Sequence, residues 1–165
     1  VTTTIEAINS TGILNAVKDW FGKERNMEIT SAALQTVANG QNVLFTETPV
    51  SGSACVVHRE GSGIITLRGQ TNQCRARYRV SFGANIAVPD GGTAGAISVA
   101  LALNGEPLAA STAIVTPTAA AAFFNVSLDT FVEVPRGCCV TVAVENTSGA
   151  DISVQNANLI AERVC

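Results

Sequence analysis

Charged residues are scarce in this chain. Only 14% of its 165 residues are Asp, Glu, Lys or Arg, against roughly a quarter in an average soluble domain, while 47% are hydrophobic. A surface so poor in charge is either polar through Ser, Thr, Asn and Gln or covered by partners. The formal net charge is −3, which argues against a general nucleic-acid-binding protein, because such a protein must neutralise many phosphates.

Long apolar runs are also missing. Runs such as residues 94–103 and 119–124 are shorter than the ~20 residues that a membrane-spanning helix needs. The chain does not open on a basic cluster followed by an apolar stretch and a small-residue cleavage site, so no secretory signal is visible, and we expect either synthesis in the cytoplasm or a chain that has already been processed. The sequence therefore predicts a protein that does not act in a membrane.

Histidine occurs once, at His58. A catalytic triad or a histidine-based metal site would have to be built around it, and we find no nucleophile elbow, no His-Glu-x-x-His motif and no Gly-rich phosphate loop. We interpret His58, followed by Arg59 and Glu60, as a polar residue at a strand end. The sequence thus predicts neither an enzyme nor a cofactor.

The chain has five cysteines, Cys55, Cys74, Cys138, Cys139 and Cys165. Their spacing lacks Cys-x-x-Cys, so we expect no zinc site. Adjacent Cys138 and Cys139 point to opposite faces of a strand, and the odd total leaves at least one thiol outside any disulfide within the chain. Two interpretations stay open: buried thiols in a protein assembled in the cytosol, or Cys55 or Cys74 bonded to Cys138 or Cys139 with Cys165 linking subunits.

An amphipathic helix is predicted at the start of the chain. Thr3 and Glu6 form a capping box, and Gly22 followed by Lys23 supplies a stop, so the helix spans about residues 4–21. Residues 23–30 are polar and predict a linker. The helix packs on its own domain or serves as an anchor or stalk, and its apolar face has helical spacing: Ile5, Ile8, Ile13, Val17, Trp20 and Phe21.

From residue 32 onward the hydrophobic period changes to two, which is typical of β-strands. The clearest case is 75–88, where apolar residues alternate with polar ones, and 96–103 alternates again before the hairpin signal Asn104-Gly105. The frequent turn signals, without intervening helices, predict an antiparallel jelly-roll sandwich of about ten strands. The other strands are expected at 43–46, 55–58, 63–67, 124–129, 140–145 and 152–164.

One face of the 75–88 strand carries Arg75, Arg77 and Arg79, which form a stripe about 13 Å long. The stripe is expected either to pair with Glu or Asp of a neighbouring strand or subunit, or to bind an anionic glycan or a charged partner shell.

The strand at 96–103 has a face of small residues, Ala96, Ser98, Ala100 and Ala102. This face is too apolar for free solvent and too small for a thick core. We therefore expect it to pack closely against another subunit.

Three segments resemble the tumour-necrosis-factor-like (complement-type) jelly rolls: ARYRVSFGANIAV, AISVALALNGEPL and VPRGCCVTVAVENTSGADISVQNANLIAERV. The likeness covers residues 31–165 and is nearer to bacterial and phage members, which include the heads of spore-surface collagen-like proteins and trimeric phage fibre or decoration domains. The resemblance implies a homotrimer that serves as a head, a cap or a knob. Residues 1–30 then form the anchor or stalk.

These observations predict a structural virion protein on the surface of a bacteriophage, made in the host cytoplasm. It would be a trimeric capsid decoration or head-fibre knob that binds a capsid or other shell protein through its N-terminal segment. The alternative is a glycan- or receptor-binding head on a fibre, or on a bacterial spore or cell surface. Fold-level likeness alone does not decide between them.

Overall fold

The computed structural model describes residues 26–51, 55–69, 75–137 and 139–164. The predicted helix with its apolar face (Ile5, Ile8, Ile13, Val17, Trp20 and Phe21) lies outside the described residues, as do Cys74, Cys138 and Cys165. Within the described ranges, no helix has the length and apolar character to cross a membrane.

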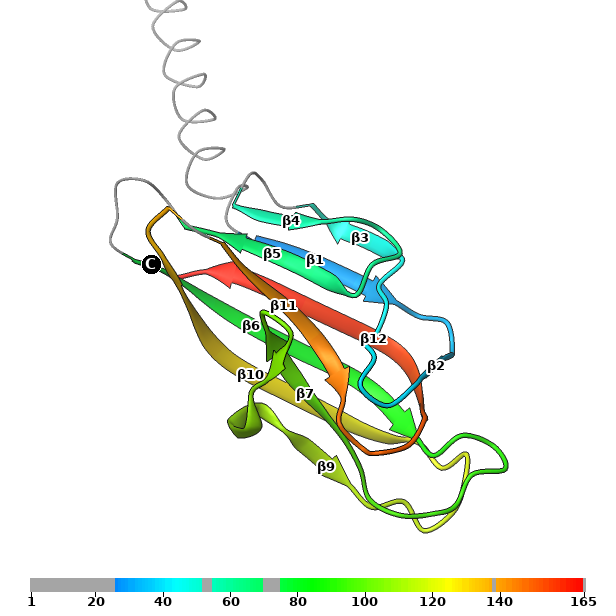
Figure 1. Cartoon of the computed structure of the whole chain (residues 1–165). Helices are drawn as coiled ribbons and strands as arrows, with labels where there is room; N and C mark the ends of the chain where they lie inside the picture. Colours follow the sequence, from blue (N-terminus) through cyan, green and yellow to red (C-terminus); the bar gives the residue numbers. More distant parts are fainter. Residues whose placement is uncertain (1–25, 52–54, 70–74, 138, 165) are drawn as a thin grey trace, which may run out of the picture.

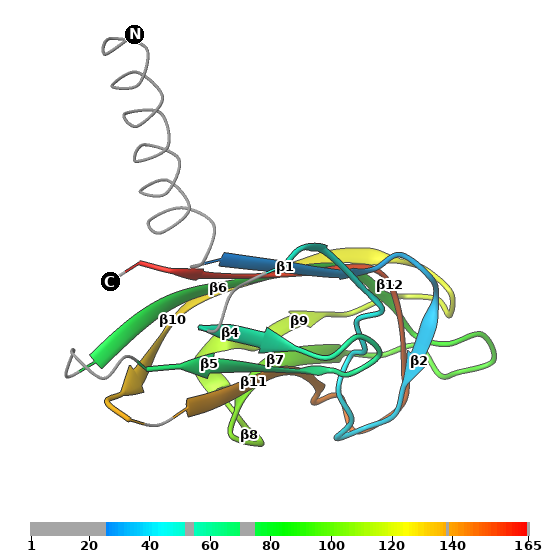
Figure 2. The ribbon, with the colours of Figure 1, turned by 90° about the horizontal axis from the view of Figure 1, so that it is seen from above.

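The described residues form twelve strands in two antiparallel sheets that pack face to face (Figures 1 and 2). Sheet A has the order β10-β6-β12-β1-β3, with β2 also paired to β12, and sheet B has the order β4-β5-β11-β7-β8, with β9 also paired to β7. Sheet A contains β1 (Asn26–Ser31), β2 (Gln35–Val37), β3 (Glu47–Val50), β6 (Arg75–Ala87), β10 (Phe124–Pro135) and β12 (Ile152–Arg163). Sheet B contains β4 (Val56–His58), β5 (Ile64–Arg68), β7 (Ile97–Leu103), β8 (Glu106–Pro107), β9 (Ala113–Val115) and β11 (Cys139–Asn146).

The core lies between the two sheets and follows from the alternation in the sequence. In β6, every second residue from Ala76 to Ile86 is buried. The inward residues of sheet B meet them, so that Leu67 and Leu101 are also completely buried. The predicted antiparallel two-sheet sandwich is confirmed.

Two local predictions are wrong. The segment expected as a linker contains β1, in which Met27, Ile29 and Ser31 point into the core while the intervening residues are half exposed. With only two apolar side chains, this strand gives little hydrophobic signal. The residues expected as a strand at 43–46 belong to no strand and precede β3, with Val43 and Phe45 buried in the core.

The face of small residues is covered only in part within a single chain, since Ala96 is exposed and Ser98 is half-buried. Ala100 and Ala102 are buried, and Ala102 lies between Ala143 of β11 and Pro107 of β8. The Ser111 hydroxyl accepts a hydrogen bond from the Leu101 amide at 3.0 Å, which connects the segment after β8 to β7. No second subunit is needed to explain the apolar character of these two alanines.

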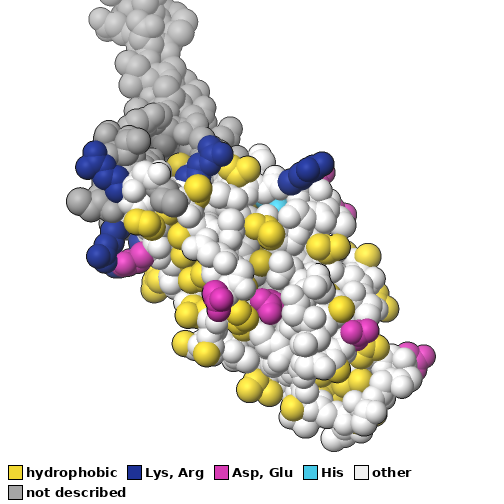
Figure 3. All heavy atoms as spheres, viewed as in Figure 1, with side chains coloured by type: hydrophobic (Ala, Val, Ile, Leu, Met, Phe, Trp, Pro, Cys, Tyr) yellow, Lys and Arg dark blue, Asp and Glu magenta, His cyan; other side chains and the backbone are white. Residues whose placement is uncertain are grey.

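The two ends of the sandwich differ. We call the end at which β1 begins the proximal end and the opposite end the distal end. At the proximal end, β1 begins at Asn26 opposite Glu162, and β12 ends at Arg163 (Figure 1). The space-filling view shows arginine side chains over this end (Figure 3). At the distal end, loops 88–96 and 116–123 and the turn 147–151 come together. Residues 1–25 therefore join the sandwich at its proximal end.

Candidate functional site

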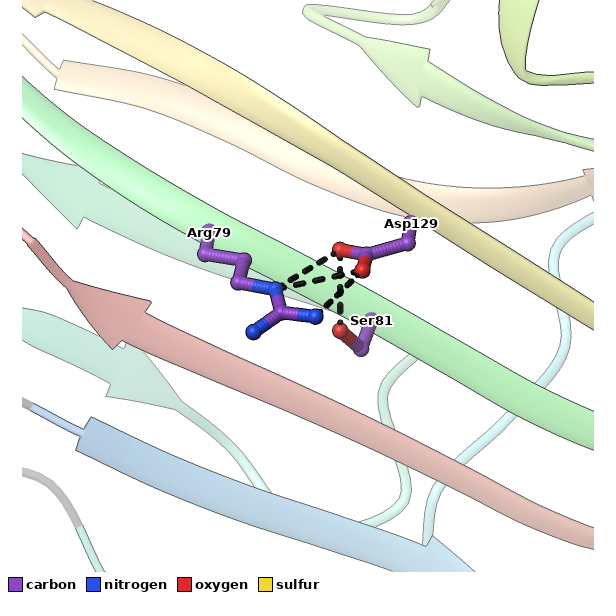
Figure 4. A network of polar contacts seen from close by, with 3 residues as sticks. All are labelled: Arg79, Ser81 and Asp129. Carbon is purple, nitrogen blue, oxygen red and sulfur yellow. Dashed lines mark hydrogen bonds and ion pairs between the residues drawn. The ribbon is translucent and has the colours of Figure 1, made fainter.

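An ion-pair network lies on the outer face of sheet A, where β6 and β10 run side by side (Figure 4). Arg79 donates from Nε to both carboxylate oxygens of Asp129 at 3.1 Å, and from Nη2 to Oδ2 at 2.6 Å. The Ser81 hydroxyl donates to the same carboxylate at 3.1 Å. The hydrogen bonds from Arg79 hold the pKa of Asp129 below its usual value, and Asp129 in turn raises the pKa of Arg79.

The other two arginines of the stripe share one carboxylate. Arg75 donates to Glu133 Oε2 at 3.0 Å, and Arg77 donates to Oε1 at 2.9 Å. The hydrogen bond from Arg77 and the nearby charge of Arg75 lower the pKa of Glu133. Of the two roles expected for the stripe, the structure shows pairing with acids of a neighbouring strand.

The distal part of the same face is neutral and polar. The Asn125 amide donates to Asn85 at 3.2 Å, and the Asn85 amide donates to Asn156 at 3.3 Å, so three strands are linked by a ladder of side-chain amides. Closer to the proximal end, the Asn158 amide donates to the Glu28 carboxylate on β1. Such groups form directional hydrogen bonds to a partner surface, but they offer no nucleophile for catalysis.

Two exposed apolar regions bear on assembly. The first is the open edge of sheet B at strand β9, where Ile114 is 66% exposed. The second lies on the outer face of sheet A, where Ile160 and Val50 flank Glu28 in one cross-strand row and where Phe131, 62% exposed, lies opposite Arg79. Exposed apolar residues of this kind mark candidate protein contacts.

The described cysteines lie at the proximal end on either side of Arg68. Cys139 pairs with Arg68 across β11 and β5, and the Arg68 amide donates to the Cys55 carbonyl. With one strand between them, their Cα atoms are about 10 Å apart, beyond the roughly 7 Å limit for a disulfide. The described residues contain no group of three or more His, Cys, Asp or Glu side chains that could hold a metal ion.

His58 lies at the end of β4, where its Nε2 atom is 3.0 Å from the Ser62 carbonyl oxygen. That contact belongs to the tight turn between β4 and β5. We see no chemistry built around this histidine in the described structure.

The distal end holds an open pocket of about 460 Å³. It is lined by the acidic residues Asp90 and Asp151, by the apolar residues Pro89 and Ile97, and by glycines of the loop 88–96. Sequence reasoning did not identify this pocket, because its two sides come from loops about 60 residues apart in the chain.

Solved structures show the same fold. The matches include the globular domain of zebrafish complement 1qA protein (10% identity over 86% of this chain and 98% of that chain, TM-score 0.55) and Eiger TNF from S. frugiperda (12% over 86% and 94%, TM-score 0.60). Murine APRIL matches at 10% identity over 85% and 99%, with a TM-score of 0.57. The chain has the complement and tumour-necrosis-factor jelly-roll fold. No protein-family model and no curated protein matches the sequence.

Proposed function

We propose that the protein is a structural protein of the bacteriophage virion, a homotrimeric capsid decoration or head-fibre knob at the virion surface. Three features support this proposal: the jelly-roll fold, the low charge of the chain, and the attachment of residues 1–25 at one end of the sandwich. The protein would act by binding to a shell and to copies of itself.

The observation that carries the assembly is the separation of the exposed apolar residues. Ile114 lies at the open edge of sheet B, whereas Ile160 lies on the outer face of sheet A. A contact of the edge of one subunit with the face of the next joins two different surfaces, and head-to-tail contacts of this kind form a closed ring when the rotation from one subunit to the next closes. Burying each such side chain contributes roughly 1.5–3 kcal/mol. The family resemblance implies that the ring has three members.

The anchor is the predicted amphipathic helix. Because residues 1–25 join the sandwich at its proximal end, an anchor there leaves the distal loops pointing away from the shell. The apolar face proposed to contact the shell protein is the one predicted from the sequence, Ile5, Ile8, Ile13, Val17, Trp20 and Phe21.

The test is the mass of the full chain in solution, measured by light scattering. We expect three times the chain mass of 17.0 kDa for the wild type, and a monomer for Ile114→Glu, since a carboxylate cannot be buried at the contact without a partner. Val57→Glu, on the outer face of sheet B, is the matched control and should stay trimeric. A wild-type monomer would contradict the proposal.

A glycan- or receptor-binding head is the second candidate, and the distal pocket favours it. Carboxylates beside an apolar wall can hold the hydroxyl groups and the carbon face of a sugar. Saturable binding on a glycan array that is lost in Asp151→Asn would support this function. An array with no signal for the wild type would count against it.

A further inference from the structure

Charge is divided unequally between the two ends of the molecule. Six of the seven described arginines lie at or near the proximal end, where the described carboxylates are Glu28, Asp129, Glu133 and Glu162, so this end has a formal charge of +2. The rest of the described chain has one arginine, Arg59, and six carboxylates, for a formal charge of −5. Figure 3 shows the resulting arginine-rich end. The six arginines are Arg68, Arg75, Arg77, Arg79, Arg136 and Arg163.

The arginines at the rim of this end have capacity for further contacts. Arg68 at the end of β5 and Arg136 in the turn after β10 are exposed, and neither forms an ion pair with a described residue. The Arg75 side chain is 73% exposed and shares the Glu133 carboxylate with Arg77. These residues come from both sheets and lie at the same end of the sandwich as the start of β1.

We propose that this arginine end, defined by Arg68, Arg75 and Arg136, is a docking surface for an acidic patch on a protein shell. The inference rests on the proposed function, because it assumes that residues 1–25 tether the protein to such a shell. The positive end would be attracted to acidic side chains, while the negative remainder would be repelled. The protein would therefore dock in one orientation.

Carboxylates of a folded protein are the partner that this surface fits best. Guanidinium groups bind carboxylates through two parallel hydrogen bonds, as Arg79 and Asp129 do within this chain. A long polyanion such as a nucleic acid would extend beyond the small positive region and meet the negative remainder of the molecule. The patch is thus suited to a compact acidic surface.

The experiment measures binding of the full chain to an immobilised poly-glutamate peptide at about 50 mM and about 300 mM salt, because exposed charge pairs weaken as salt rises. Arg136→Glu should weaken binding about fivefold or more at the lower salt concentration, and Arg68→Glu should behave alike. Arg59→Glu is the matched control, since it makes the same charge change in the turn between β4 and β5. It should alter binding less than about twofold.

Equal weakening by Arg59→Glu and Arg136→Glu would overturn the proposal, because only net charge would then matter. Tighter binding to heparin or to phosphatidylserine vesicles than to the peptide would also overturn it in favour of another polyanion. Light scattering on the same samples separates the two proposals. If the protein is a trimer but does not bind the peptide, only the proposed docking surface is refuted. If it is a monomer whose binding depends on Arg136, only the proposed trimeric assembly is refuted.

Discussion

Tyr78 is a polar side chain enclosed by the sandwich. It is the only tyrosine of the chain, is completely buried, and donates a hydrogen bond to the Arg68 carbonyl at 2.6 Å, with the Cys55 carbonyl 3.2 Å away. Burial, followed by the effect of Cys55, raises the pKa of Tyr78 to about 12. The folded protein therefore favours the neutral phenol. Through its hydroxyl, Tyr78 connects strand β6 with β5 and with the start of β4.

We predict that alkali destabilises the protein through this residue. The pKa of Tyr78 in the folded protein, about 12, lies above the ordinary value of 10.0. The contribution of Tyr78 to the free energy of unfolding is therefore complete below pH 10 and is lost as the pH rises towards 12. Phenolate absorbance should titrate near pH 12 in the native protein and near pH 10 in denaturant. The control is Tyr78→Phe, which should show no such titration. A native midpoint near pH 10 would contradict the prediction.

Asn146 shows what single-sequence analysis misses at this scale. It is completely buried, and its amide donates to the Val37 carbonyl at 2.9 Å and the Ala150 carbonyl at 2.7 Å, while its Oδ1 atom accepts the Ser148 amide at 2.9 Å. In the sequence it is one more polar residue before a turn. Its partner on β2 is 109 residues away, so only the folded chain reveals that it joins the two sheets at the distal end.

Among the elements, the β6–β10 pair owes part of its stability to the network around Asp129. The side chains of Arg79 and Asp129 remain about half exposed, at 52% and 49%, so the ion pair contributes only modestly. The pKa of Asp129 is lower in the folded protein than in the unfolded chain. The contribution of the ion pair to stability is therefore present above the pKa of the unfolded chain and is lost as the pH falls through the pKa of the folded protein.

Asp129→Asn should therefore be slightly less stable than the wild type at pH 7, and the difference in melting temperature should vanish in acid below the folded pKa. Asp151→Asn, at an exposed aspartate outside the network, serves as the control and should match the wild type at both pH values. The prediction fails if the difference between Asp129→Asn and the wild type is unchanged at low pH.

Three long strands were predictable because apolar residues recur at every second position in β6, β7 and β11. In β12 the register shifts between Gln155 and Asn158, and its signal was the turn that precedes it, whereas β1 has too few apolar residues to give a signal. The arginine stripe was found as a candidate. Its acidic partners were not assigned, because Asp129 lies 50 residues beyond Arg79 and the pairing depends on the register of two strands.

At the scale of the whole molecule, the proposed edge-to-face contact makes a prediction that a symmetric contact does not. Ile114→Glu damages only the edge, and Ile160→Glu damages only the face, so each variant alone should be monomeric. An equimolar mixture should form a heterodimer, because the edge of the Ile160→Glu chain and the face of the Ile114→Glu chain are both intact. Light scattering measures this directly, with each variant alone at the same total concentration as the control. A mixture that stays monomeric would argue against the edge-to-face arrangement.

The pairing of β1 with β12 also decides how the protein carries mechanical load. Their register runs from Asn26 opposite Glu162 to Ser31 opposite Ala157, and the hydrogen bonds between them lie perpendicular to the strands. A pull that enters at Asn26 and leaves through the distal loops runs along β1. It therefore shears all of these hydrogen bonds at once instead of peeling them apart one by one. A knob attached to its particle at this point would resist detachment of its first strand under flow.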